Sequence, residues 1–182
     1  MGISLSTSMS SALVIGICCA ALGSPAAWSQ EQKHIHFTNT SNNSRYVQQH
    51  LIDAGDVPGH QVRIFEIHWV YPKGDVAFDG VRVQESSARG FSDYINGNGP
   101  NSNYTTYVLE DGNKIFSRNQ GAAHTTVNAD GSKNSRFFVV ETLVGGTGKF
   151  RGIRGILRST GNFDPKAGWL TIETDGDYWI EQ

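Results

Sequence analysis

From His60 onward, apolar and polar residues alternate in short runs that are separated by turn sequences. Strands are predicted near Gln61–Tyr71, Val81–Ser87, Gly90–Asn96, Asn103–Leu109, Lys114–Asn119, Ala122–Val127, Ser135–Leu143, Gly152–Gly161, Gly168–Thr174 and Asp177–Glu181. A period of two is typical of half-buried strands, because successive side chains point to opposite faces. Turn formers separate the runs, as in Asn96–Pro100, Asp111–Asn113 and Asp175–Asp177. Many short strands without a helical period predict an all-β antiparallel sandwich or closed barrel.

One connection is unusually rich in glycine. The segment Gly145-Gly146-Thr147-Gly148-Lys149-Phe150-Arg151-Gly152 joins two apolar, alternating runs. Glycine reaches positive φ without steric cost, so this segment predicts a hairpin. It is not a phosphate-binding loop, because Phe150 and a strand pattern follow Lys149 where that motif needs Ser or Thr opening a helix. The stretch from Glu141 to Gly161, ETLVGGTGKFRGIRGILRSTG, resembles the late hairpin of the dirigent and allene oxide cyclase-like barrels.

This resemblance implies an eight-stranded antiparallel, calycin-like β-barrel with a central cavity. Barrels of that size can hold one small ligand, here an apolar or phenolic molecule. The resemblance also implies a homo-oligomer, a dimer or a trimer. The activities in this family hold a reactive intermediate so that it closes to one stereoisomer, which needs no cofactor. Dirigent proteins commonly carry a cysteine pair in the mature chain, and its absence here favours a bacterial exported relative.

The N-terminal segment has the features of a signal peptide. Residues 1–29 contain no Lys, Arg, Asp or Glu, and the apolar run Ala12–Leu22 is too short to span a bilayer. Small residues in Ala27-Trp28-Ser29 predict cleavage before Gln30 and an exported protein, periplasmic or secreted. An uncleaved anchor is the alternative. The predicted organisation is a signal peptide at 1–29, an N-terminal arm at 30–59 and the barrel domain at 60–182.

Composition narrows the partners and the chemistry. The formal net charge is −2, and no basic stripe is present, which argues against nucleic acid. No later apolar run could span a membrane, so no membrane association is expected after cleavage. Cys18 and Cys19 both precede the cleavage site, so the mature chain would have no disulfide and no thiol chemistry. His34 and His36 share one strand face, but no third ligand is apparent, and we expect no metal.

Glu66 and His68 are the first candidate for acid–base chemistry. In the strand 62–71 both faces are largely apolar, which predicts that both are covered. Glu66 and His68 lie on one face among aliphatic residues. An unpaired buried carboxylate is costly, so Glu66 should have a partner or a raised pKa. Glu66 is therefore predicted as an acid–base residue oriented by His68, unless the two form a solvent-facing or interface ion pair.

Glu141 is the second candidate. It shares a strand face with Phe137, Val139 and Leu143, so one carboxyl group interrupts an apolar stripe. A carboxyl group in an apolar cavity fits general acid–base chemistry. The alternative is a solvated glutamate at the rim of the glycine-rich hairpin.

Five further residues are candidates for ligand binding. Tyr104, Tyr107, Arg118 and His124 lie on the middle strands and could donate hydrogen bonds or stabilise an anion, and Trp69 could stack on a ligand. Packing or rim positions are the simpler interpretation for each of them.

Three functions are therefore consistent with the sequence. The first is a cofactor-independent isomerase or cyclase acting on an apolar or phenolic molecule. The second is a non-catalytic carrier of the same fold. The third is a structural, oligomeric barrel that large inward side chains such as Phe65, Trp69 and Phe137 fill.

Overall fold

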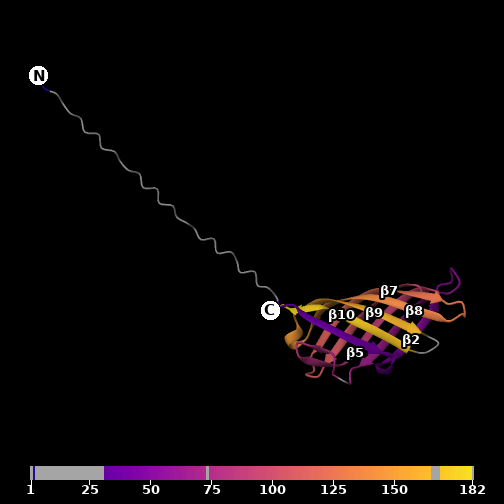
Figure 1. Ribbon diagram of the computed structural model, residues 1–182, viewed down its shortest axis with the longest axis horizontal. Coiled ribbons are helices and arrows are strands. Elements are labelled where there is room, and N and C mark those ends of the chain that lie inside the picture. The colour runs from indigo at the N-terminus through magenta and orange to yellow at the C-terminus, as the bar shows by residue number, and fades with distance from the viewer. Residues whose placement is uncertain (1, 3–30, 73, 165–168, 182) are drawn as a thin grey trace.

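The structure, a computed structural model, describes residues 2, 31–72, 74–164 and 169–181 (Figure 1). The predicted signal peptide, with Cys18, Cys19 and the cleavage site, lies outside the described residues apart from Gly2. Within the described part of the chain, no helix has the length and apolar character needed to cross a membrane.

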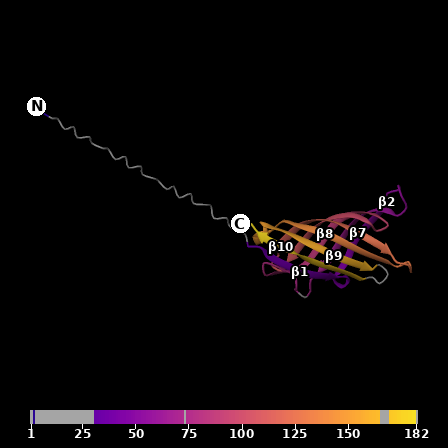
Figure 2. The same ribbon diagram turned by 45° about the horizontal axis from the view of Figure 1, so that its top comes forward.

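The chain forms one curved, antiparallel, ten-stranded sheet, which confirms the all-β prediction. Two short 3-10 turns, η1 (Ser41–Asn43) and η2 (Gly148–Phe150), interrupt it. The sheet order is β1-β10-β9-β8-β7-β6-β5-β3-β2, and β4 pairs with β5. Figure 2 shows β1, β10, β9, β8 and β7 following one another in this order. The strands are β1 (Lys33–Thr40), β2 (Ser44–Asp53), β3 (His60–Val70), β4 (Ala77–Phe78), β5 (Val81–Ile95), β6 (Gly99–Leu109), β7 (Lys114–Val127), β8 (Lys133–Gly146), β9 (Ile153–Asp164) and β10 (Trp169–Ile180).

Three pairs of predicted strands are single long strands. β5, β7 and β10 each run through a position where the sequence predicts a break. In β10 the predicted turn at Asp175–Asp177 lies inside the strand, where a Cβ on Gly176 would come 2.3 Å from the Ile156 carbonyl oxygen. Here glycine allows close approach of neighbouring strands and does not mark a turn.

Residues 33–53, for which the sequence predicts an arm, contribute β1 and β2 to the sheet. β1 pairs with β10 along its whole length, and Ile35 and Phe37 belong to the hydrophobic core. The Phe37 ring packs edge-on against Tyr71, which directly follows β3, with a centroid distance of 6.3 Å. The two strands at the ends of the sheet order, β1 and β2, are consecutive in sequence, and the Phe37–Tyr71 contact joins β1 to the end of β3.

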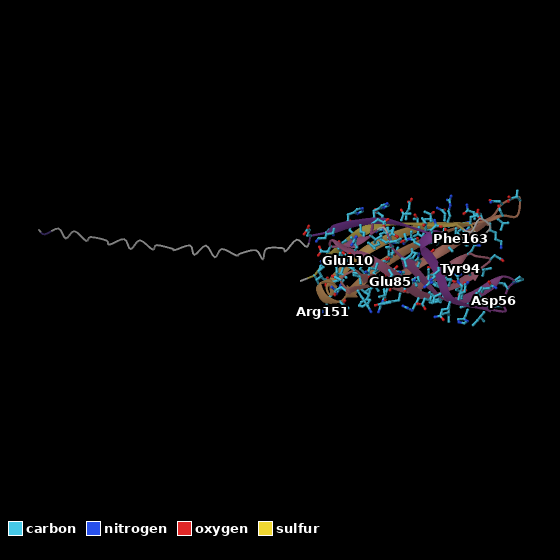
Figure 3. The ribbon with its side chains drawn as sticks, turned by 90° about the horizontal axis from the view of Figure 1, so that it is seen from below. Asp56, Glu85, Tyr94, Glu110, Arg151 and Phe163 are labelled. Atoms are coloured by element: carbon cyan, nitrogen blue, oxygen red, sulfur yellow. The ribbon has the colours of Figure 1, made fainter. Side chains whose placement is uncertain are left out.

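The two ends of the sheet differ. Figure 3 places Glu110 and Arg151 at one end and Asp56 at the other, and we call these the Arg151 end and the Asp56 end. Core residues fill the Arg151 end, where the Phe78 ring contacts Tyr178 and Tyr107 at centroid distances of 5.2 and 5.6 Å. The core is made of Ile35, Phe37, Tyr71, Val76, Phe78, Val83, Tyr107, Leu109, Ile115, Leu143, Phe150, Ile153, Leu157 and Tyr178.

The glycine-rich segment is the predicted hairpin between β8 and β9. Gly148 has φ +53°, and a Cβ there would lie 2.2 Å from Oδ1 of Asn113, so this position requires glycine. Thr147 Oγ1 accepts a hydrogen bond from the Lys114 backbone N–H at 2.8 Å. The turn carries Phe150 into the core, where it is fully buried. The segment is thus structural and covers the Arg151 end.

Candidate functional site

The side chains of this sheet alternate between an inner face, which carries the core, and an outer face exposed to solvent. Polar residues occupy much of the inner face beyond the apolar Arg151 end. The buried polar and charged residues are Asn39, Ser86, Ser92, Thr105, Ser117, Asn119, Glu141, Ser159 and Thr174. Buried polar groups are normally hydrogen-bonded, so a polar interior of this kind needs partners.

Glu141 is the one ionisable carboxyl group among these buried residues. It lies on β8 between Val139 and Leu143 on the inner face and is 5% exposed. Tyr107 Oη on β6 donates a hydrogen bond to Glu141 Oε1 at 2.8 Å. Glu141 is therefore buried and not solvated at the rim, and its partner is a tyrosine on β6, with β7 between the two strands.

Burial sets the protonation of this group. It raises the pKa of Glu141 above its usual range, and the neighbouring hydroxyl groups of Ser117 and Tyr107 oppose that shift. Burial, and next the charge of Glu141, raise the pKa of Tyr107 well above that of a free tyrosine. Burial also raises the pKa of Tyr71 to about 12. The tyrosines are therefore neutral hydrogen-bond donors, and the Glu141 carboxyl group holds its proton to a higher pH than a solvated glutamate does.

An amide network lies next to Glu141. Asn119 on β7 is its cross-strand neighbour. Asn119 Nδ2 donates to Asn103 Oδ1 at 2.6 Å and to Thr105 Oγ1 at 2.8 Å. On the other side of Tyr107, the hydroxyl groups of Tyr71 and Ser86 are hydrogen-bonded at 3.0 Å. These contacts hold the polar groups of β5, β6 and β7 in fixed positions around the carboxyl group.

Several buried polar atoms on the inner face have no hydrogen-bond partner within the described part of the chain. They are Asn39 Oδ1, Arg63 Nε, Trp69 Nε1, Ser92 Oγ, Ser117 Oγ and Asn119 Oδ1. An orphaned buried donor or acceptor costs about 1–3 kcal/mol, which a bound water or ligand group would recover. The inner face thus offers both donors and acceptors to a bound molecule.

Glu66 and His68 lie on the outer face instead. Their neighbour on that face, Ile64, is 60% exposed, whereas Phe65 on the inner face is 7% exposed. Glu66 pairs with Arg89 at 2.5 Å and accepts a hydrogen bond from Gln48 at 3.1 Å. His68 contacts Glu85 at 3.1 Å. The structure therefore pairs Glu66 with Arg89 and His68 with Glu85, both on β5, and the two residues do not pair with each other as the sequence allowed.

The other predicted residues divide between the two faces. Tyr107 and Trp69 point inward, and Trp69 packs against the core. Tyr104 is on the outer face, where its ring stacks on Phe116 at 6.3 Å. Arg118 and His124 line two shallow depressions on the outer surface of β7 and β8. Of the eight predicted site residues, the structure brings Glu141 and Tyr107 together on the inner face. Tyr104 and Arg118 are cross-strand neighbours on the outer face of β6 and β7.

The sequence analysis missed the residues that surround this pair. The alternation of the predicted strands could have placed three of them, Asn103, Thr105 and Asn119, on one shared inward face. Tyr71 and Asn39 were harder to find, because they meet only when β1 lies across the end of β3.

A second polar cluster lies on the outer face of β1 and β10. His34 contacts Asp177 at 3.1 Å and Asp175 at 3.2 Å, and His36 contacts Asp175 at 3.5 Å. The side-chain hydrogen bond to Asp177 is the main cause of a raised pKa for His34. Among the described residues no group of His, Cys, Asp and Glu has a geometry that could hold a metal ion.

Comparison with known proteins found similarity only at the level of three-dimensional structure. No protein-family model and no curated protein sequence matches this chain. The solved structure of the pterocarpan synthase dirigent protein PsPTS1 is similar over 84% of this chain and 97% of its own, with 18% identity and a TM-score of 0.45. That of the pterocarpan synthase dirigent protein GePTS1 is similar over 97% and 98%, with 16% identity and a TM-score of 0.46. Similarity at this level supports no conclusion about activity, ligand or assembly.

Proposed function

We propose that this protein binds a small apolar or phenolic molecule against the inner face of its sheet and promotes its isomerisation or cyclisation. The observation that carries the proposal is the buried Glu141 carboxyl group, hydrogen-bonded to Tyr107 and surrounded by polar atoms that lack partners. A carboxyl group with a raised pKa in a partly apolar site is suited to general acid–base catalysis.

We further infer that the sheet closes into an eight-stranded barrel around this site. β1 and β2, the two ends of the sheet order, are joined by η1 alone. Counting β1 and β2 as one bent strand leaves eight strands, with β4 as a side pairing on β5. The contact between Phe37 on β1 and Tyr71, which follows β3 next to the other end of the sheet order, supports this closure.

The proposed chemistry is a proton transfer with no change in ligand composition. Tyr107 donates its hydrogen bond to Oε1 of Glu141, which leaves Oε2 as the oxygen that carries the transferable proton. Glu141 donates this proton to a ligand oxygen while a bond rearranges, and then takes a proton back from the rearranged ligand. Confinement by the inner face selects the conformer that reacts, which supplies much of the rate effect.

Glu141→Gln tests the catalytic role, and Glu66→Gln is the matched control on the outer face. The wild-type protein and both variants would be purified from the native host, and bound molecules would be extracted and separated by chromatography with mass detection. We expect Glu141→Gln to retain an isomer of the wild-type molecule with equal mass and different retention. Glu66→Gln should carry the same molecule as the wild type.

Other results would support a different function for the protein. The same unconverted molecule in the wild type and in Glu141→Gln would identify a non-catalytic carrier. The absence of any bound molecule from the wild-type protein and from Glu141→Gln alike would favour a structural barrel. Loss of conversion in Glu66→Gln would indicate that the chemistry takes place on the outer face.

A further inference from the structure

Arg63 is a cation on the inner face of the sheet, enclosed by aromatic rings. It lies on β3, two residues before the buried Phe65 and on the same face. Its guanidinium carbon is 5.2 Å from the ring centre of Phe65, 5.4 Å from that of Tyr46 and 6.0 Å from that of Tyr94. These three rings come from β3, β2 and β5, so three neighbouring strands form the enclosure.

Among the described residues, no carboxylate forms an ion pair with this cation. The ion pairs of the described residues include Arg82, Arg89 and Arg154, each with a glutamate, but none includes Arg63. Arg63 Nε is buried and has no hydrogen-bond partner. The cross-strand neighbour of Arg63 on β5 is Ser92, whose buried Oγ also has no partner.

The aromatic rings alone do not satisfy the guanidinium. A cation over a ring is attracted to the face of the π-system, but its N–H donors lie in the guanidinium plane and stay available. A planar guanidinium matches the two oxygens of a carboxylate, and such charge-assisted pairs are stronger than neutral hydrogen bonds. An interior arginine with rings and free donors is therefore complementary to an aromatic carboxylate.

The position of the cluster supports access from solvent. Tyr94 lies toward the Asp56 end of the molecule (Figure 3), opposite the end that Phe150 and the core fill. Tyr46 is half-exposed, so the ring enclosure reaches the surface. Asn101 Nδ2 donates to Tyr94 Oη at 3.0 Å, which fixes the orientation of that ring.

We propose that Arg63 binds the carboxylate of an aromatic acid at the Asp56 end of the inner face, with the ligand's ring against Phe65 and Tyr94. Ser92 Oγ donates a further hydrogen bond to the same carboxylate. This rests on the proposed function, because the rest of the ligand then extends along the inner face toward Glu141. It adds the class of molecule that the site accepts.

The test compares 4-hydroxycinnamate with its methyl ester, which has the same ring and no charge. Binding would be measured by titration calorimetry at fixed ionic strength for the wild type, Arg63→Met, Arg63→Lys and the control Arg118→Met, whose arginine is on the outer face. We expect the wild type to prefer the acid over the ester by about tenfold or more, since a charge-assisted hydrogen bond contributes more than a neutral one. Arg63→Met should lose this preference while still binding the ester, Arg63→Lys should keep part of it, and Arg118→Met should keep all of it.

Three results would overturn the proposal: an unchanged preference in Arg63→Met, a loss of preference in Arg118→Met, or failure of the wild type to bind the acid. Circular dichroism and thermal unfolding would establish that each variant is folded. Glu141→Gln separates the two proposals, because it should stop conversion of the native ligand yet bind 4-hydroxycinnamate with the wild-type preference. Acid binding that depends on Arg63, together with full conversion in Glu141→Gln, would refute the acid–base role alone.

Discussion

Two glutamates on separate strands, Glu66 on β3 and Glu141 on β8, have opposite environments, and this difference decides their chemistry. Glu66 has a cationic partner in Arg89 and is on the outer face. Glu141 has no cationic partner among the described residues, is buried and accepts a hydrogen bond from the Tyr107 hydroxyl. The Glu66 ion pair links two strands, whereas the buried Glu141 carboxyl group holds its proton to higher pH.

Glu141→Gln should become more stable relative to the wild type as the pH rises. The unfolded chain releases the Glu141 proton near the ordinary pKa of a glutamate, about 4.3. The folded protein holds that proton to higher pH, because burial raises the pKa of Glu141. Between the two pKa values the folded state binds more protons, so the wild type loses stability as pH increases, whereas the glutamine variant does not.

Urea unfolding of both proteins from pH 4 to pH 8 measures this difference. The free energy of unfolding of Glu141→Gln minus that of the wild type should increase from pH 4 and level off above the folded pKa. Glu66→Gln, which breaks a surface ion pair, should cost about 1 kcal/mol or less and show no such gain. A difference for Glu141→Gln that does not vary with pH would contradict the raised pKa.

At the scale of strands and turns, the sequence pattern predicted most elements but not their extents. Alternation located β3, β6, β8 and β9, because each has one buried and one exposed face. Gly90, Gly121 and Gly176 lie inside strands where a Cβ would meet the neighbouring backbone, and composition cannot separate such glycines from turn glycines. The role of β1 depends on pairing with β10, at the other end of the chain, which no local pattern encodes.

His60 joins the loop after β2 to β5. Its Nδ1 contacts Asp56 Oδ1 at 2.6 Å, and its Nε2 contacts Asp93 Oδ1 at 2.6 Å. The side-chain hydrogen bonds to Asp93 and then Asp56 raise the pKa of His60 above its ordinary value of 6.5. An imidazole that has a carboxylate on both nitrogens is most stable as the cation, which donates on both sides.

Because the pKa of His60 is raised, its contacts with Asp56 and Asp93 stabilise the fold at low pH only. Its contribution is complete below the unfolded pKa, near 6.5, and is lost as pH rises through the folded pKa. NMR titration of the His60 ring should give a midpoint above 6.5, and Asp93→Asn should lower that midpoint more than Asp56→Asn does. The wild type should also lose more thermal stability than His60→Gln between pH 6 and pH 8. A midpoint at or below 6.5 would contradict the double contact.

At the scale of the whole molecule, the sequence predicts which residues share a strand face but not which face is inside. Alternation predicted that Glu66 and His68 lie on the opposite strand face from Phe65 and Trp69, and the structure has the same arrangement. Both faces of that strand are apolar, and only the packing of the whole curved sheet places Phe65 on the buried face. A slip of one residue exchanges every inward and outward side chain, so a site inferred from one strand depends on the register of all the others.

Export stays a prediction, and the N-terminus of the protein tests it. If residues 1–29 are a signal peptide, the protein recovered outside the cytoplasm should begin at Gln30, as N-terminal sequencing or intact mass would determine. Such a chain has no cysteine, so its unfolding should not change with added reductant. An intact N-terminus on membrane-bound protein would favour the uncleaved anchor.

A contact across the core makes the stability of β1 depend on a residue beyond β3. Phe37 on β1 and Tyr71, which directly follows β3, are both buried, and their rings meet edge-to-face. Phe37→Ala should cost about 3–5 kcal/mol because it leaves a cavity in the core. His36→Ala, next to it on the exposed face, should change stability by about 0.5 kcal/mol or less.

A double-mutant cycle of Phe37→Leu with Tyr71→Leu should give a coupling energy of about 0.5–1.5 kcal/mol by urea unfolding, the range of an aromatic pair. Additive effects would mean that β1 and the segment after β3 are energetically independent, which would contradict the proposed closure of the sheet.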